Sequence, residues 1–269
     1  MRSYGILEQT SVTDDIDKAV ESVRGIGYAV INGDYDQGQI ERLSAAFGRA
    51  HHEAARAHGG MDALRAIDEH NTIRLPLAYE QEFVELARNE RIAAICSRLI
   101  GDYFVLNQQN GVTNPARTET YSQGAWHRDL PYQHVVLSRP IAVGALFCID
   151  EFTNTNGATR VLPASHRHEA FPSESYVEAH ATTVEAPAGS FIVIDSMLFH
   201  TGGQNTTETA RRGVNHVYTT PIIRQQIEIP AALGDSFTTD GKLRRLLGYD
   251  VQTPRSIADY LNMRKRKKS

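Results

Sequence analysis

Hydrophobic residues in the first hundred positions recur mainly at the three- and four-residue spacing that is typical of amphipathic helices. Four series show this spacing, and they begin at Ile16, Ile40, Phe83 and Ile92. The last series ends near Gly101, a residue type that often follows a helix. Between the first two series, residues 28–31 form a short apolar run that indicates a strand. We therefore expect residues 1–100 to be mainly helical support for one face of a sheet.

From residue 103 the pattern changes to short β-rich runs separated by clusters of Gly, Pro, Asn and Thr. The runs cover residues 103–108, 141–149, 182–185, 190–194 and 213–220. A parallel α/β fold requires a helix between successive strands, and this stretch has little room for one. The pattern therefore favours a β-sandwich or barrel. We expect a single domain over residues 1–269, with its β core at 101–222 and a C-terminal extension at 223–269.

Two segments combine turn-forming residues with little apolar periodicity. In residues 110–122, Asn110-Gly111 and Asn114-Pro115 are expected to interrupt any long strand. In residues 166–180, the turn-rich start at Pro172 has the same effect. We expect both segments to be surface loops that form a mobile rim around a functional site.

Composition and charge narrow the class of function. The chain has 269 residues, a formal net charge of -4 and a pI of about 6.3, so it has no broad positive field for nucleic acid. It has two cysteines, no apolar amino-terminal segment, and no apolar run long enough to cross a bilayer. These features predict a cytoplasmic protein that acts on a small molecule and has neither a nucleic-acid nor a membrane partner.

The sequence His127-Arg128-Asp129 is the first candidate for chemistry. Residues two apart on an extended strand project to the same side, so His127 and Asp129 can grip one ion. His200 follows the apolar run 190–194 and can supply a third ligand. Two imidazoles and one carboxylate form the facial triad of non-haem iron(II) oxygenases. Because the chain has 11 histidines, a His-x-Asp pair alone also arises by chance.

Arg211 strengthens the interpretation because it lies eleven residues after His200, just before a β-like run. A buried guanidinium can hold a carboxylate bidentately, as the distal end of 2-oxoglutarate requires. Arg212 is the competing residue. A shift of one residue turns a strand side chain to the opposite face, so only one of the two arginines is expected to enter the pocket.

Three blocks of sequence together resemble the phytanoyl-CoA dioxygenase family of iron(II)/2-oxoglutarate oxygenases. The blocks are Trp126 to Asp129, Asn156 to His166, and His200 to Arg211. The resemblance spans roughly residues 100–222. It implies a mainly β fold with helical support, a double-stranded β-helix (jelly roll, cupin-like). It also implies iron(II), 2-oxoglutarate as co-substrate, and O2.

The same resemblance assigns roles to individual residues. His127, Asp129 and His200 correspond to the iron ligands, and Arg211 to the clamp on 2-oxoglutarate. Asn114 resembles an asparagine that related enzymes place near the metal-binding end of 2-oxoglutarate. Gln108, on a strand that enters the sheet, is a further cofactor-binding candidate. The carboxylate at position 129 favours hydroxylation, because related halogenases have a small residue there.

The substrate is less well defined by the sequence. Trp126, Tyr132 and His134 lie beside the predicted iron ligands and are candidates for substrate contacts, although core packing explains an aromatic residue there equally well. We expect hydroxylation of a small-molecule metabolite or natural-product intermediate, with formation of succinate and CO2. Two alternatives are a cupin-like metal enzyme that does not use 2-oxoglutarate and an inactive jelly-roll binding protein.

Overall fold

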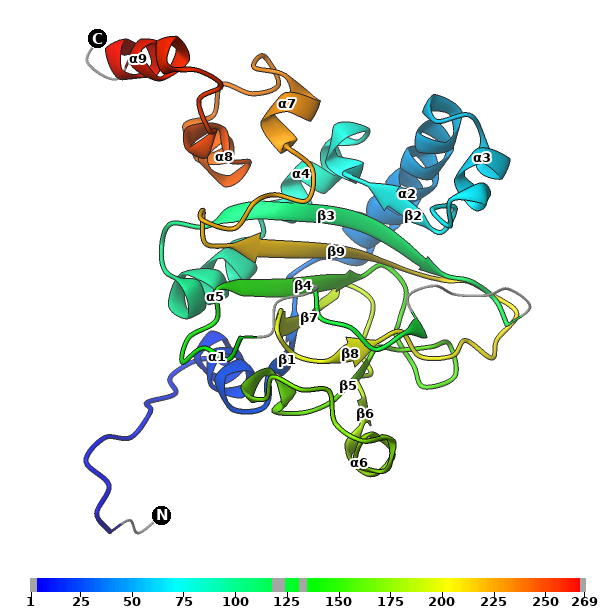
Figure 1. Cartoon of the computed structure of the whole chain (residues 1–269). Coiled ribbons are helices and arrows are strands. Elements are labelled where there is room, and N and C mark those ends of the chain that lie inside the picture. The colour runs from blue at the N-terminus through cyan, green and yellow to red at the C-terminus, as the bar shows by residue number, and fades with distance from the viewer. Residues whose placement is uncertain (1–3, 118–123, 131–134, 267–269) are drawn as a thin grey trace.

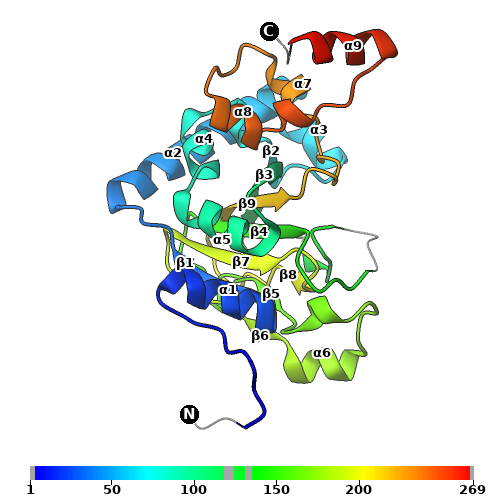
Figure 2. The same cartoon turned by 90° about the vertical axis from the view of Figure 1, so that its left-hand side faces the viewer.

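The computed structural model describes residues 4–117, 124–130 and 135–266. Helices pack on one face of a six-stranded sheet, and a three-stranded sheet lies on the side of its other face (Figure 1). The view in Figure 2, turned by 90°, shows the same succession of helices, large sheet and small sheet. The chain thus has the two-sheet, helix-supported architecture that the sequence predicts.

Helices form most of the chain before residue 101 and after residue 228. In these two regions they are α1 (Asp15–Ile26), α2 (Gln37–Ala57), α3 (Met61–Ala66), α4 (Gln81–Ala87), α5 (Glu90–Ile100), α7 (Ile229–Leu233), α8 (Gly241–Leu246) and α9 (Ile257–Arg266), and α6 (Glu174–His180) lies between them. The four predicted helical series are confirmed as α1, α2, α4 and α5. Helix α1 shows why its ends are sharp: Asp14 caps its amino end, and Gly27 closes it with φ 92°.

The large sheet is antiparallel throughout, with the strand order β1-β7-β4-β9-β3-β2. Its strands are β1 (Tyr28–Asn32), β2 (Thr72–Arg74), β3 (Val105–Asn114), β4 (Ala142–Cys148), β7 (Ser190–Asp195) and β9 (Arg211–Thr219). The small sheet has the order β6-β5-β8, with β5 (Arg160–Val161), β6 (Thr182–Thr183) and β8 (His200–Thr201). The two sheets stay separate, as the halves of an open jelly roll rather than a closed barrel.

Alternation along the strands divides the large sheet into a helix-facing side and an inner side. Val193 and Val214 lie in the main hydrophobic core together with residues of α1, α2, α4 and α5. Ile192, which precedes Val193 on β7, lines a cavity on the inner side of the sheet. Leu146 of β4, which pairs with Ile192, lines the same cavity. Both faces of the central strands are therefore covered, which explains why β4 and β7 read as nearly continuous apolar runs.

The expectation that Asn110-Gly111 interrupts a strand is wrong. Strand β3 continues without a turn to Asn114, and Gly111 pairs with Val214 of β9. A Cβ at Gly111 would lie 2.9 Å from the Phe47 ring. The glycine therefore serves close packing of α2 on the sheet, and it does not form a turn.

Residues 166–180 are also more ordered in secondary structure than predicted. Pro172-Ser173 does not begin a long loop, because Ser173 caps helix α6 and its hydroxyl accepts a hydrogen bond from the Tyr176 amide. Residues 118–122 of the other predicted rim segment lie outside the described residues.

The C-terminal residues pack over the β3 side of the sheet. Leu243 of α8 and Leu247 belong to the main core, and Gln225 ties the segment down by donating to the carbonyls of Leu106 and Leu247. Within the described part of the chain, no helix has the length and apolar character needed to cross a membrane.

Candidate metal centre

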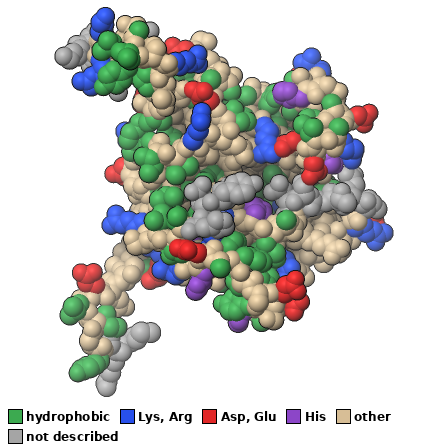
Figure 3. Space-filling model, viewed as in Figure 1, with side chains coloured by type: hydrophobic (Ala, Val, Ile, Leu, Met, Phe, Trp, Pro, Cys, Tyr) green, Lys and Arg blue, Asp and Glu red, His purple; other side chains and the backbone are tan. Residues whose placement is uncertain are grey.

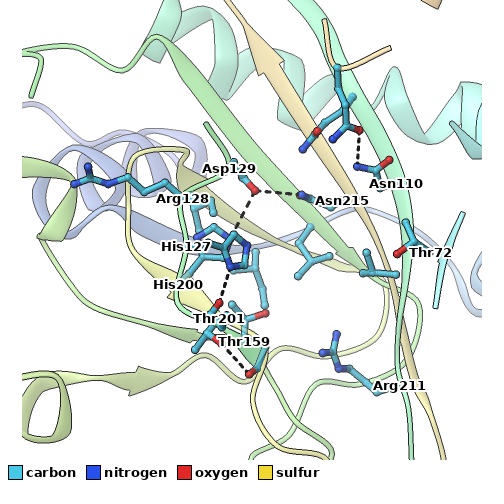
Figure 4. Close-up of a pocket in the computed structure, with 18 of the residues that line it drawn as sticks. Thr72, Asn110, His127, Arg128, Asp129, Thr159, His200, Thr201, Arg211 and Asn215 are labelled. Atoms are coloured by element: carbon cyan, nitrogen blue, oxygen red, sulfur yellow. Dashed lines mark hydrogen bonds and ion pairs between the residues drawn. The ribbon is translucent and has the colours of Figure 1, made fainter. Parts of the chain in front are cut away.

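His127, Asp129 and His200 converge on one point at the edge of the inner cavity (Figure 4). One ligand atom from each lies within 4.8 Å of the others. The His200 Nε2 atom is 3.7 Å from Oδ1 of Asp129, and the two imidazole centroids are 4.3 Å apart. Among the residues that the structure describes, this is the one group of three or more His, Cys, Asp or Glu with such geometry.

Backbone hydrogen bonds hold the two ligand segments together. The amides of His127 and His200 each donate to the carbonyl of the other, at 2.9 and 3.0 Å, so His127 extends the small sheet beside β8. The Asp129 amide donates to the Ser196 carbonyl at 3.1 Å. The three side chains are thus placed by main-chain pairing and do not depend on one another for their position.

Both imidazoles have the orientation that a metal ligand needs. The Nδ1 atoms of His127 and His200 lie 2.8 and 3.0 Å from the carbonyls of Ala125 and Leu198. A carbonyl only accepts, so each Nδ1 carries the proton and each Nε2 presents a lone pair. Burial lowers the pKa of His200, against an opposing effect of Asp129, and this keeps the ring neutral.

Asp129 provides the clearest sign that a cation fits here. Its Oδ2 atom is buried and has no hydrogen-bond partner among the described residues. Its Oδ1 atom is 3.5 Å from Nδ2 of Asn215. A buried carboxylate oxygen without a partner is costly, and a metal ion bound by two imidazoles and one carboxylate would satisfy it. The donor set therefore fits iron(II).

Gly144 of β4 leaves the space that the Asp129 carboxylate occupies. A Cβ at this position would lie 2.7 Å from Oδ2 of Asp129 and 2.7 Å from Cγ1 of Ile194. We expect Gly144→Ala to displace the carboxylate and to weaken iron(II) binding about 10- to 100-fold, the range for changes that disturb ligand orientation. Anaerobic metal titration measures this. Gly48→Ala, in open space on α2, is the matched control and should leave metal affinity unchanged.

Arg128 points away from the two ligands that flank it, and it joins the loops behind the metal centre. Its Nε donates to the Met197 carbonyl at 2.8 Å, Nη2 donates to the His168 carbonyl, and the guanidinium stacks on Phe199 at 3.9 Å. Burial lowers the pKa of Arg128. These contacts connect the chain around residue 168 with the turn that leads into β8.

We expect Arg128→Met to lower the free energy of unfolding by about 2–4 kcal/mol, because buried carbonyls lose charged donors. Iron(II) affinity should fall with it, since the turn before His200 loses a support. Denaturant unfolding and metal titration give the two quantities. Arg42→Met, at an exposed position of α2, is the control, and an equal effect of both substitutions would contradict the assigned role.

Arg211 lies in the same cavity of about 420 Å³, which the triad and the inner faces of β3, β4, β7 and β9 enclose. The side chain is only 2% exposed, donates through Nη2 to the Gly157 carbonyl at 2.9 Å, and stacks on Phe152 at 3.8 Å. Arg212 faces the opposite side of β9 and forms an ion pair with Asp150 at 2.7 Å. The alternation of β9 therefore directs Arg211 into the cavity.

Gln108 and Asn114, the two other residues predicted to contact 2-oxoglutarate, differ in whether they line the cavity. Gln108 lines the cavity. Asn114 is not among the lining residues, and its amide donates to the carbonyls of Gly157 and Gly203 at 3.1 and 2.9 Å. A direct contact of Asn114 with 2-oxoglutarate stays a prediction. Asn114 holds the Gly157 carbonyl that Arg211 also binds.

The predicted substrate contacts are only partly covered by the described residues. Trp126 does not line the cavity, because it alternates with His127 and packs against Phe171 with ring centroids 6.0 Å apart. A substrate contact of Trp126 stays a prediction. Tyr132 and His134 lie outside the described residues.

Sequence reasoning did not identify Gly144, Asn215 or Asn110 as part of the site. Asn215 lies four residues after Arg211, so strand alternation from the predicted clamp could have found it. Gly144 carries no such signal, because its role depends on a contact with the distant Asp129 segment.

A jelly roll that places a His-x-Asp pair and a distal histidine beside a buried arginine is the arrangement of iron(II)- and 2-oxoglutarate-dependent oxygenases. Residues 23–213 match the family phytanoyl-CoA dioxygenase (PhyH), and the chain belongs to this family. It is therefore an enzyme of the iron(II)/2-oxoglutarate oxygenase class.

Individual proteins show the same relationship. The "Uncharacterized protein Rv1501" of Mycobacterium tuberculosis is 30% identical over 252 residues, which cover 91% of each chain. The "Iron/alpha-ketoglutarate-dependent dioxygenase ausU" of Aspergillus calidoustus is 32% identical over 131 residues, covering 45% of this chain and 42% of that protein. The crystal structure of EctD from S. alaskensis with 2-oxoglutarate and 5-hydroxyectoine has the same fold, with a TM-score of 0.61, 23% identity and coverage of 78% and 77%.

Proposed function

We propose that the chain hydroxylates a small-molecule metabolite or natural-product intermediate in a reaction that converts 2-oxoglutarate to succinate and CO2. The proposal treats residues 1–269 as one catalytic domain, with His127, Asp129 and His200 as the iron ligands. The observation that carries it is the placement of this triad and Arg211 in one cavity, with a buried Asp129 oxygen that no described residue satisfies.

Each part of the cavity has a distinct task in this proposal. The imidazoles present Nε2 lone pairs, and the Asp129 carboxylate adds a negative charge at the same point. Arg211, fixed by Gly157 and Phe152, binds the distal carboxylate of 2-oxoglutarate and so orients it towards the triad. Iron(II), when bound with 2-oxoglutarate, supplies the activation of O2.

The apolar side of the cavity limits the access of water. Leu146 of β4 and Ile192 and Ile194 of β7 form the wall beside the triad. A wall of aliphatic side chains offers no hydrogen bond to water and does not react with an oxidant as readily as sulfur or aromatic groups. It therefore strengthens the charge interactions of Arg211 and Asp129 with their ligands.

A carboxylate ligand is present at position 129, which supports hydroxylation over halogenation. The alternative of a cupin-like enzyme without 2-oxoglutarate leaves Arg211 without a task inside the cavity, and family membership also disfavours it. An inactive binding protein would not need a complete triad.

Consumption of 2-oxoglutarate tests the proposal without knowledge of the substrate. We expect the iron(II)-loaded protein to convert 2-oxoglutarate slowly to succinate and CO2 in air even without its substrate, because the triad and Arg211 face one cavity that can hold iron(II) and 2-oxoglutarate together. The reaction should stop when either iron or O2 is withheld. Succinate formation that is independent of iron, or none at any iron concentration, would refute the proposal.

A further inference from the structure

The inner face of the large sheet changes from apolar to polar along one cross-strand row. Starting from Ile192, the directly paired neighbours are Leu146, Asn215, Asn110 and Arg74, on β4, β9, β3 and β2. Such neighbours lie side by side on one face of a sheet. Figure 4 shows the result: Asn110 and Thr72 lie across the cavity from the triad, and Arg211 lies at a separate end.

The orientation of the Asn110 amide follows from its neighbours. Arg74 is held by two hydrogen bonds to Glu69, and its Nη1 lies 3.5 Å from Oε1 of Gln226. Because arginine only donates, Gln226 must turn its oxygen towards Arg74. The same oxygen then accepts from Nδ2 of Asn110 at 3.1 Å. One of the two N–H groups of the Asn110 amide is thereby used.

Other polar atoms on this side of the cavity are available to form hydrogen bonds with a ligand. Asn110 is 6% exposed, and within the described chain its Oδ1 atom is buried without a hydrogen-bond partner. The terminal torsion of asparagine is soft, so a small rotation can present this oxygen to a ligand. The side chains of Gln108 and Thr72 line the cavity and make no hydrogen bond to any other described residue. Together they offer both acceptors and donors.

The charged side chains around the cavity already have partners or a proposed ligand other than the substrate. Arg74 is paired with Glu69, Arg128 binds main-chain carbonyls behind the triad, and Asp129 and Arg211 face the metal and 2-oxoglutarate. Beyond Asn215 the wall consists of three neutral amides, the Thr72 hydroxyl, the Val112 side chain, and Arg74, whose charge is balanced by Glu69. On the face shown in Figure 3, histidine surface is visible near the centre, and basic side chains are scattered over the face rather than gathered around it.

We propose that Thr72, Gln108, Asn110 and Gln226 form the substrate subsite and that it recognises a neutral molecule with several hydroxyl groups, such as a glycoside or polyol. Hydroxyl groups both donate and accept, as this wall requires, and they bring no charge that needs a counterion. An acyl chain would leave the amides of the wall without hydrogen bonds. This inference rests on the proposed function, because it places the substrate opposite the triad.

Saturation-transfer NMR on the 2-oxoglutarate-bound protein tests the subsite, with zinc in place of iron because zinc is redox-silent. The probes are methyl glycosides and inositol, a set of amino acids, and medium-chain fatty acids. We expect the hydroxylated probes to bind preferentially. Asn110→Leu and Gln108→Met should each weaken them about tenfold, the effect of one lost hydrogen bond. Gln37→Leu, which changes an exposed amide on α2, is the matched control.

Gln108→Met keeps the test valid if Asn110→Leu folds poorly, since Gln108 makes no side-chain hydrogen bond to the described residues. Preferential binding of amino acids or fatty acids, no binding of hydroxylated probes, or equal binding by wild type and both variants would overturn the inference. Succinate formation without substrate is measured on the wild-type protein and on Gln37→Leu, which lies outside the cavity. If the wild-type protein lacks that activity, the proposed function fails, whereas retained activity with no selective binding refutes the subsite alone.

Discussion

Replacing His127 or His200 by alanine will abolish iron(II) binding and turnover while the fold persists. Each change removes one of three protein ligands, so we expect metal affinity to fall by more than the roughly 10- to 100-fold loss that follows disturbance of a ligand's support. The fold should survive because neither ring belongs to a hydrophobic core cluster, and the backbone pairing of the two residues does not need their side chains. Anaerobic iron titration and thermal unfolding measure the two effects.

His52→Ala is the matched control, since His52 is exposed on α2, a helix that contributes no residue to the triad. It should retain both metal binding and succinate formation. Full activity of His127→Ala or His200→Ala would show that the metal, if one is bound, is held elsewhere.

Arg211→Ala will raise the concentration of 2-oxoglutarate needed for turnover far more than Arg212→Ala. Truncation of one partner in a buried, charge-assisted pair typically costs about 2–5 kcal/mol, which corresponds to a KM increase of about 30-fold or more. Arg212 is bound to Asp150 on the other side of the sheet, so its loss should alter stability only slightly. Succinate formation as a function of 2-oxoglutarate concentration gives both values.

The two arginines are adjacent in the chain but lie on opposite faces of β9 and have different partners. Arg211→Lys adds a further comparison: a lysine keeps the charge but loses the planar fork, and it should fall between wild type and Arg211→Ala. A larger effect at Arg212 than at Arg211 would mean that the register of β9 is shifted by one residue.

Long periodic elements were predictable from the sequence alone. The helical series at Ile16 and Ile92 became α1 and α5, and the apolar runs at 141–149 and 190–194 became β4 and β7. The helices and strands depend on periodic patterns that local sequence carries. The jelly roll and the convergence of His127, Asp129 and His200 were expected from the resemblance of three sequence blocks to a known family.

Features that depend on contacts between distant segments were not predictable. Strands β2, β5 and β8 have only two or three residues, too few for an alternating pattern, and they exist because a partner strand lies beside them. In the sequence, Asn110-Gly111 is typical of a turn. Only the structure shows that Gly111 makes room for the Phe47 ring. Asn114 has the expected position in the chain, but the carbonyls of Gly157 and Gly203 occupy its amide.

An anaerobic titration of the wild-type protein with iron(II), followed by 2-oxoglutarate, shows directly whether the triad and Arg211 hold both. We expect iron alone to bind without a visible band. Addition of 2-oxoglutarate should then produce a metal-to-ligand charge-transfer band that saturates at one equivalent of iron per chain. The band should be absent in His200→Ala and should require much more 2-oxoglutarate in Arg211→Ala. Iron binding without any band at saturating 2-oxoglutarate would show that the protein does not hold 2-oxoglutarate on the metal.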